Sequence, residues 1–126
     1  MKIIITGASG FVGQNLLRFL KKDNDLIPLS IRYNQNKKFN LNSSVVIHLA
    51  GKAHDLKKTS EDKDYYEANT ELTKKVFDQF LESSSKVFIF MSSVKAAKDV
   101  VQGILSEDVM PDPVTVYGKS KLAAEE

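Results

Sequence analysis

The sequence predicts an α/β fold, in which a parallel sheet has helices on both of its faces. Short runs of almost continuously apolar residues recur along the chain, and such runs are typical of parallel strands buried on both sides. Segments with apolar residues at helical spacing separate these runs. Alternating strands and helices form right-handed crossovers, which keep successive strands parallel.

Strands are expected at residues 2–6, 26–31, 45–50 and 87–91, and helices at residues 11–22, at about 65–82 and from about 115 onward. The connection at residues 32–44 is polar and rich in asparagine, and it is too short for a crossover helix, a strand and a further helix. We therefore expect a short additional strand near residues 38–41, reached by a loop.

The composition is that of one domain with an ordinary core. Of the 126 residues, 42% are hydrophobic and 27% are charged, and the formal net charge is +2. That balance argues against a nucleic-acid or membrane partner. The sequence has no cysteine and only two histidines, so we expect no disulfide and no metal site. It also has no apolar stretch near the ~20 residues of a membrane-spanning helix, so we expect a cytoplasmic location.

Three evenly spaced glycines follow the first expected strand directly. Gly7 permits a tight turn, Gly10 lets phosphates approach the backbone, and Gly13 lets the next helix pack closely on the strand. Free amide groups and the positive end of the helix dipole would hold the phosphates. A strand, a glycine turn and a helix in this order predict a dinucleotide-binding loop and a Rossmann-type sheet.

Two later strands end in residues suited to a ligand site. The strand at 45–50 leads into small residues that allow close approach of a cofactor, and the strand at 87–91 delivers the hydroxyls of Ser92 and Ser93. Asn69 lies in the helix between these two strands. Because the carboxyl ends of parallel strands share one edge of the sheet, this edge is the expected site.

Tyr117 and Lys121 lie four residues apart, on one face of the last expected helix. A tyrosine ordinarily has a pKa near ~10 and is a poor base at neutral pH, but a neighbouring ammonium stabilises the phenolate. Ser93 would then hold a substrate oxygen while Tyr117 gives or takes its proton. Hydride would move to or from a nicotinamide.

Together these motifs resemble the short-chain dehydrogenase/reductase superfamily, in its extended branch, the NAD-dependent epimerase/dehydratase family. The matching stretches are the Thr-Gly-x-x-Gly-x-x-Gly loop at 6–13, the His-Leu-Ala strand end at 48–50, Asn69, the Ser-Ser pair at 92–93 and the Tyr-x-x-x-Lys pair at 117–121. The resemblance implies an NAD(P)-dependent nucleotide-sugar epimerase, dehydratase or 4-keto-reductase of the UDP-hexose or UDP-N-acetylhexosamine class. Residues 48–54 and 92–95 also look like a subgroup that acts on UDP-N-acetyl-hexosamines in bacterial surface-polysaccharide synthesis.

Carried onto this sequence, the resemblance implies a catalytic set of Ser93, Tyr117, Lys121 and Asn69. The cofactor-binding residues that it implies are Gly7, Ser9, Gly10, Phe11, Val12, Gly13, Arg32, Leu49, Ala50, Gly51, Ser92, Tyr117 and Lys121. His48 is expected to be a satisfied core residue, and His54 a surface loop residue, with substrate contact as the alternative.

The end of the second expected strand bears on the choice of cofactor. Members of the family commonly keep an acidic residue there for the adenosine ribose hydroxyls, whereas this sequence has Ser30, Ile31 and Arg32. An arginine in place of an acid favours a 2′-phosphate, so NADP is slightly preferred over NAD. The alternative is that Arg32 is only a surface charge.

The family's remaining strands and its sugar-binding region should follow the Tyr-Lys helix, so residues 1–126 are expected to form a partial NAD(P)-binding Rossmann domain, truncated after the start of that helix. One hypothesis is the cofactor half of a full-length enzyme that takes a nucleotide-sugar substrate, with the 126-residue chain inactive alone. The other is a catalytically incompetent dinucleotide-binding fragment or module. Members often pair through the Tyr-Lys helix, and the strand at 87–91 would expose an apolar edge, so we expect a homo-oligomer.

Overall fold

The computed structural model describes residues 1–33, 37–53 and 60–126. Within them, a sheet of four parallel strands has the order β2-β1-β3-β4. The strands are β1 (Lys2–Thr6), β2 (Asp25–Leu29), β3 (Val45–His48) and β4 (Val87–Phe90). The predicted parallel sheet is confirmed, with strand ends that differ from the expected ones by one or two residues.

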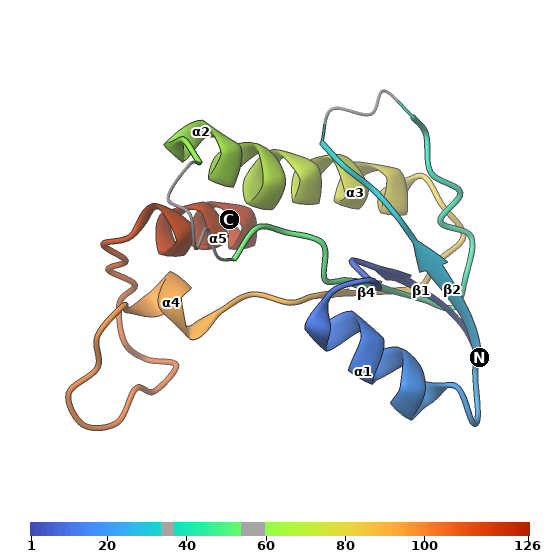
Figure 1. Cartoon of the computed structure of the whole chain (residues 1–126), viewed down its shortest axis with the longest axis horizontal. Helices are drawn as coiled ribbons and strands as arrows, with labels where there is room; N and C mark the ends of the chain where they lie inside the picture. The colour runs from blue at the N-terminus through green and yellow to red at the C-terminus, as the bar shows by residue number, and fades with distance from the viewer. Residues whose placement is uncertain (34–36, 54–59) are drawn as a thin grey trace.

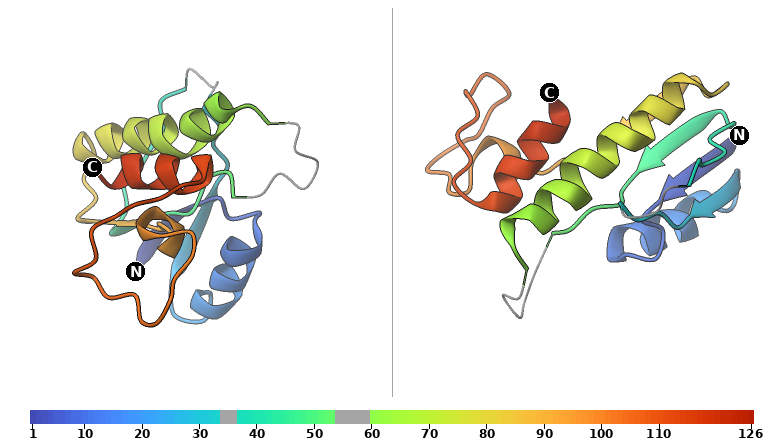
Figure 2. Two further views of the ribbon diagram at one scale, coloured as in Figure 1. Left: turned by 90° about the vertical axis from the view of Figure 1, so that its left-hand side faces the viewer. Right: turned by 90° about the horizontal axis from the view of Figure 1, so that it is seen from above.

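Helices cover both faces of this sheet, as Figure 1 shows with α3 on one side and α1 on the other. The helices are α1 (Phe11–Leu20), α2 (Asp62–Tyr65), the π-helical turn η1 (Tyr66–Glu71), α3 (Leu72–Leu81), α4 (Val94–Ala97) and α5 (Val116–Glu125). From α2 through η1 to α3 the chain forms one continuous rod, and α5 lies beside it (Figure 2). The sequence predicted this rod but neither its π-helical turn nor α4.

The core has two layers because the strands are apolar on both sides. On the α3 face, Ile4 and Val46 pack with Leu72 and Val76. On the α1 face, Ile3, Ile5 and Ile47 form the buried centre, and leucines of α1 pack against it. This double burial explains why the central strands β1 and β3 lack a polar face.

The parallel register brings the carboxyl ends of the four strands into one row. Thr6 pairs with Leu29 on one side and with His48 on the other, and His48 pairs with Phe90. The loops that follow these residues therefore emerge at the same edge of the sheet. This is the edge at which open parallel sheets bind their ligands.

The additional strand expected near residues 38–41 is not formed, and that prediction is wrong. Side chains, rather than a neighbouring strand, bond the backbone here. The amide of Phe39 donates to Gln79 Oε1 at 2.6 Å, and the amide of Asn42 donates to Asn40 Oδ1 at 3.1 Å. Leu41 is 1% exposed and anchors the segment in the core as an irregular loop.

A long excursion separates α4 from α5 and projects from the end of the molecule (Figure 1). Its base is closed by a bond from the amide of Asp112 to the carbonyl of Ala97 at 2.8 Å and by an ion pair of 3.6 Å between Lys98 and Asp112. In the part of the chain that the structure describes, no helix is long and apolar enough to span a membrane.

Candidate functional site

Two of the three loop glycines are required by the protein's own packing. Gly7 has a φ of +66°, and a Cβ atom there would lie 2.6 Å from the amide nitrogen of Ala50. A Cβ atom on Gly13 would lie 2.6 Å from the Cα atom of Ala8. Both distances are shorter than a carbon atom tolerates, so any side chain at either position would displace backbone.

Gly10 differs from these two glycines. Its amide closes the turn on Gly7 O at 3.0 Å, and a Cβ atom there would meet only Gly7 O, at 3.3 Å. Gly10 is also the N-cap of α1, so the cap residue has no side chain that could bond the amides of the first turn. The neighbours Ser9, Phe11 and Val12 are exposed. The helix start is thus an open cradle of amide groups, which fits a pyrophosphate.

A buried hydrogen-bond network lies behind the loop, at the strand ends. Thr6 Oγ1 accepts the amides of Leu49 and Ala50, each at 3.2 Å, and lies 2.7 Å from His48 Nδ1. The other ring nitrogen, Nε2, lies 3.0 Å from the hydroxyl of Thr73 on α3. Burial, with the charge of Lys121 as a second cause, lowers the pKa of His48 to about 4. His48 is therefore a buried core residue, and each of its two ring nitrogens has a side-chain partner.

Asn69 lies in the π-helical turn, and it is 1% exposed. Its Oδ1 accepts the amide of Lys52 at 2.7 Å, and its Nδ2 donates to the carbonyl of Lys52 at 2.9 Å. Nδ2 also donates to Ser120 Oγ, at 2.9 Å, on α5. The carboxamide thus joins the segment after β3 to the helix that carries the Tyr-Lys pair. A Cβ atom on Gly51 would lie 2.7 Å from Asn69 Oδ1, so this glycine allows the close approach.

Lys121 reaches from α5 to the end of β4. Its Nζ donates to the carbonyl of Met91 at 2.6 Å and lies 4.1 Å from the centroid of the Phe90 ring. Lys121 is 6% exposed, and this burial lowers its pKa to about 8, although the charge of Glu125 opposes the shift. An ammonium in this position would still carry most of its charge at neutral pH.

The two serines after β4 have different partners. Ser92 Oγ donates to the carboxylate of Glu125, one turn beyond Lys121. Ser93 is the N-cap of α4, and its Oγ accepts the amide of Lys95 at 3.2 Å. The hydrogen of the Ser93 hydroxyl is therefore not needed for the cap.

The family model described as the NAD dependent epimerase/dehydratase family matches residues 3–126. The chain belongs to this family.

Relatives of the epimerase/dehydratase family support the assignment at the level of fold. A UDP-glucose 4-epimerase of Vibrio cholerae is 33% identical over 146 residues, covering 98% of this chain and 44% of that protein. The UDP-glucuronic acid 4-epimerase of Bacillus cereus, solved with NAD, superposes with a TM-score of 0.85 at 24% identity, covering 99% and 49% of the two chains. RMD of Pseudomonas aeruginosa, solved with NADPH, superposes with a TM-score of 0.80 at 27% identity. The match covers 99% of this chain and 47% of that chain. The chain thus spans about half the length of the relatives it matches.

The structure of this epimerase/dehydratase chain brings most of the residues predicted for its site to one edge of the sheet. The glycine loop touches the Leu49–Ala50 backbone, Asn69 holds the segment after it, and Lys121 contacts the end of β4. Arg32 is exposed at the side of the same edge. It lines a hollow of about 250 Å³ together with the glycine loop and the residues after β2, which are Gly7, Ala8, Ser9, Pro28, Leu29, Ser30 and Ile31.

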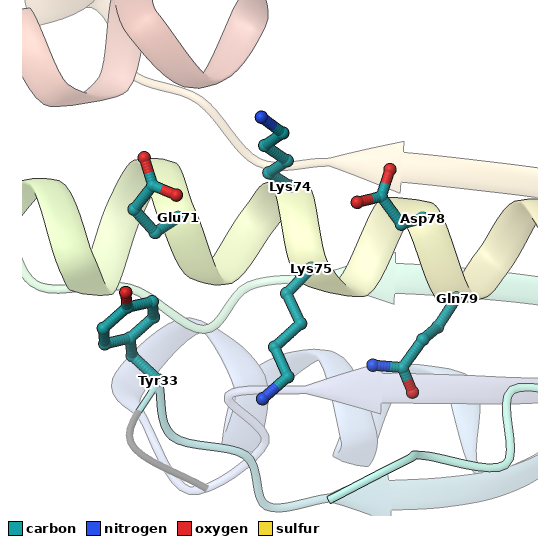
Figure 3. A pocket seen from close by; sticks show the side chains of 6 residues that line it. All are labelled: Tyr33, Glu71, Lys74, Lys75, Asp78 and Gln79. Atoms are coloured by element: carbon teal, nitrogen blue, oxygen red, sulfur yellow. The ribbon is translucent and has the colours of Figure 1, made fainter. Parts of the chain in front are cut away.

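Another hollow, of about 330 Å³, lies along the outer side of α3 (Figure 3). Its lining residues are Tyr33, Glu71, Lys74, Lys75, Asp78 and Gln79, and none of them belongs to the predicted site. His54, predicted to be a surface loop residue with substrate contact as the alternative, lies outside the described residues. Among the residues that are described, no cluster of histidine and acidic side chains has the form of a metal site.

Sequence reasoning missed several residues that build this site. Thr73 and Ser120 complete the networks around His48 and Asn69, and Asp99 holds the start of α5. The spacing of four residues between Asn69 and Thr73 was a usable signal, because it places both on one helix face. Nothing local in the sequence connects Asp99 to residues more than a dozen positions away.

Proposed function

We propose that this chain is the dinucleotide-binding half of an NAD(P)-dependent nucleotide-sugar epimerase, dehydratase or 4-keto-reductase. Two features at the carboxyl edge of the sheet carry the proposal: the start of α1, which follows β1, and Lys121, which contacts the end of β4. The first offers amide groups to a pyrophosphate, and the second supplies a cation beside the strand end. Family membership over residues 3–126 supports the same function.

In the proposed reaction the dinucleotide, once bound, supplies the acceptor or donor of a hydride. Ser93 holds a substrate oxygen through a hydroxyl hydrogen that its capping bond leaves free. Tyr117 gives or takes the proton at that oxygen, and the ammonium of Lys121 stabilises the phenolate form. Asn69 has its carboxamide engaged by Lys52 and Ser120, so its proposed part is to position α5.

Arg32 supports NADP as the preferred dinucleotide. It is exposed, lines the hollow beside the glycine loop, and has no acidic neighbour among the residues lining that hollow. A 2′-phosphate in this hollow would meet a guanidinium, which binds phosphate through paired hydrogen bonds. NAD and NADPH are each bound by solved relatives, so either dinucleotide is compatible with the fold.

Calorimetry with NADP(H) and NAD(H) tests the proposal directly. The 126-residue chain should bind NADP(H) more tightly than NAD(H). Arg32→Ala should reduce the ratio of the two affinities by about one to two decades, because a charge-assisted phosphate contact contributes about that much. The matched control is Arg18→Ala, because Arg18 is exposed on α1 and lies outside the hollow. Failure to bind either dinucleotide would remove the proposed function, whereas equal binding of both would remove only the NADP preference.

Turnover is proposed for a polypeptide of the length of the relatives. In that longer chain Tyr117→Phe should abolish hydride transfer to or from the dinucleotide, which its absorbance reports. The 126-residue chain is expected to bind dinucleotide without turning over a nucleotide sugar, because orienting the substrate supplies much of the rate. Steady turnover by the shorter chain would contradict this expectation.

A further inference from the structure

The buried ring of His48 has both nitrogens bonded, and its partners determine where its proton lies. Thr6 Oγ1 already accepts two backbone amides, so its own hydrogen is free to be donated to His48 Nδ1. The hydroxyl of Thr73 donates to the carbonyl of Asn69 at 2.6 Å, so it accepts from His48 Nε2. One tautomer satisfies every partner: the neutral imidazole with its hydrogen on Nε2.

These bonds continue on both sides of the ring. On the β1 side, Thr6 gathers the backbone amides of Leu49 and Ala50, which border the glycine loop. On the helix side, Thr73 holds the carbonyl of Asn69 within the π-helical turn. The carboxamide of that asparagine then reaches Lys52 and Ser120. One ring therefore connects the dinucleotide loop with α5.

Two aromatic rings of β4 lie close to the buried imidazole. His48 is 0% exposed, and its centroid lies 6.0 Å from the rings of both Phe88 and Phe90. Without the bond at Nδ1 the hydroxyl hydrogen of Thr6 would have no acceptor, and without the bond at Nε2 the ring hydrogen would have none. A buried donor without an acceptor is costly in an apolar environment. For that reason, a change at one group of this hydrogen-bond network should also move the groups bonded to it.

We infer that His48 is a positioning residue, which acts through Thr73 to hold Asn69 and so places Lys52 and Ser120 relative to the dinucleotide loop. A residue that only fills the core would affect stability alone. A positioning residue also affects the backbone of Lys52 and the affinity for dinucleotide. The link to affinity rests on the proposed function, whereas the tautomer and the Lys52 backbone do not depend on it.

The first experiment reads the tautomer in the unmodified 126-residue chain. Long-range ¹H–¹⁵N spectra at pH 7 should show His48 with a protonated Nε2 and an unprotonated Nδ1. A ring protonated on Nδ1, or on both nitrogens, would overturn the inference. This measurement needs no variant, so it is decisive even where a substitution damages the fold.

The second experiment removes one link with little change in shape. Thr73→Val deletes the hydroxyl between His48 and Asn69, and Thr73→Ser is the conservative control that keeps it. Thr73→Val should shift the amide signal of Lys52 and weaken dinucleotide binding by about two- to tenfold, whereas Thr73→Ser should leave both near their original values. His48→Phe should produce the same Lys52 shift, and combining it with Thr73→Val should add little, because both act on one link.

The outcomes separate the two proposals. If the unmodified chain binds no dinucleotide, the proposed function fails, and the Lys52 signal together with the tautomer still decides the role of His48. If the chain binds dinucleotide but Thr73→Val changes neither the Lys52 signal nor the affinity, the positioning role is wrong and the proposed function stands.

Discussion

The carboxylate of Asp99 holds Thr115 at the start of the helix that carries Tyr117. Its Oδ1 accepts the hydroxyl of Thr115 at 2.6 Å, and its Oδ2 accepts the amides of Thr115 and Val114 at 2.9 and 2.6 Å. Thr115 in turn caps α5, because its Oγ1 accepts the amide of Gly118 at 3.1 Å. The bond from the Thr115 hydroxyl is the largest cause that holds the pKa of Asp99 below its ordinary value of 3.8.

Replacing this cap should loosen the start of α5. Thr115→Ala removes the acceptor for Gly118 and one donor to Asp99, and it should lower the free energy of unfolding by about 1 kcal/mol in urea denaturation. Thr115→Ser keeps both bonds and should lose much less. An equal loss in the two variants would show that the hydroxyl bonds do not hold the helix start. Because the pKa of Asp99 is lowered in the folded state, its contribution is present above pH 3.8 and is lost as the pH falls through the lowered value.

His48 makes the stability of the fold sensitive to mild acid. Its folded-state pKa of about 4 lies below the ordinary 6.5, so the unfolded chain binds the proton more readily between these values. Stability should therefore fall as the pH decreases from 6.5 toward 4, by about 2 kcal/mol between pH 7 and pH 5. Urea denaturation at the two pH values measures the change. His48→Phe lacks the titrating group, and a pH dependence as steep as that of the unmodified chain would contradict the prediction.

A side chain added at Gly10 should mainly affect dinucleotide binding, whereas one added at Gly13 should mainly affect stability. Gly10→Val meets only one protein atom nearby, so the fold should survive with a change of about 1 kcal/mol while dinucleotide binding is lost. Gly13→Ala forces its methyl group against Ala8 and should lower the free energy of unfolding by about 3 kcal/mol. Circular dichroism during urea denaturation and calorimetry distinguish the two. Dinucleotide binding by a folded Gly10→Val variant would show that the loop is merely a structural turn.

Lys121 should titrate at an unusually low pH. Its burial lowers the pKa to about 8 from an ordinary 10.5, and the charge of Glu125 limits the shift. Reductive ¹³C-methylation and NMR titration should therefore reveal a lysine signal that changes near pH 8 and that is absent in Lys121→Met. Glu125→Gln should move this signal to a lower pH still, whereas Glu126→Gln, at the adjacent residue, should change it little. An unchanged signal in Glu125→Gln would contradict the assigned cause.

The β4 edge should promote self-association of the 126-residue chain. In the described sheet β4 is an outer strand, and Val87 and Ile89 on it are 45% and 44% exposed. Such a row of unpaired backbone groups with apolar side chains favours pairing with a second copy. Sedimentation velocity should therefore detect dimers or larger species, and Ile89→Lys should shift them toward monomer. A monomer at all concentrations of the unmodified chain would disprove the association.

Local sequence determined the sheet, the glycine loop and the main helices of this protein. The apolar runs at β1 and β3 have no polar face, which is typical of parallel strands buried on both sides. The glycine spacing at the start of α1 is in part a local requirement, since Gly13 packs against Ala8 within the same turn and Gly7 has a positive φ. The contact of Gly7 with Ala50 forms only when β1 and β3 have paired. The predicted catalytic role of Asn69, Ser93, Tyr117 and Lys121 stays a prediction, although the strand and helices that carry them were expected from the sequence.

Tertiary structure alone decided how those residues are held. Residues 38–41 could have formed a strand, but Gln79, distant in sequence, bonds the Phe39 amide and the segment remains a loop. Asn69 is occupied by Lys52 and Ser120, and Asp99 closes an excursion onto Thr115. Each of these contacts joins groups that are separated along the chain and meet only after the strands have paired. Their energies arise from burial and hydrogen bonding in the folded state, so no local pattern of residues records them.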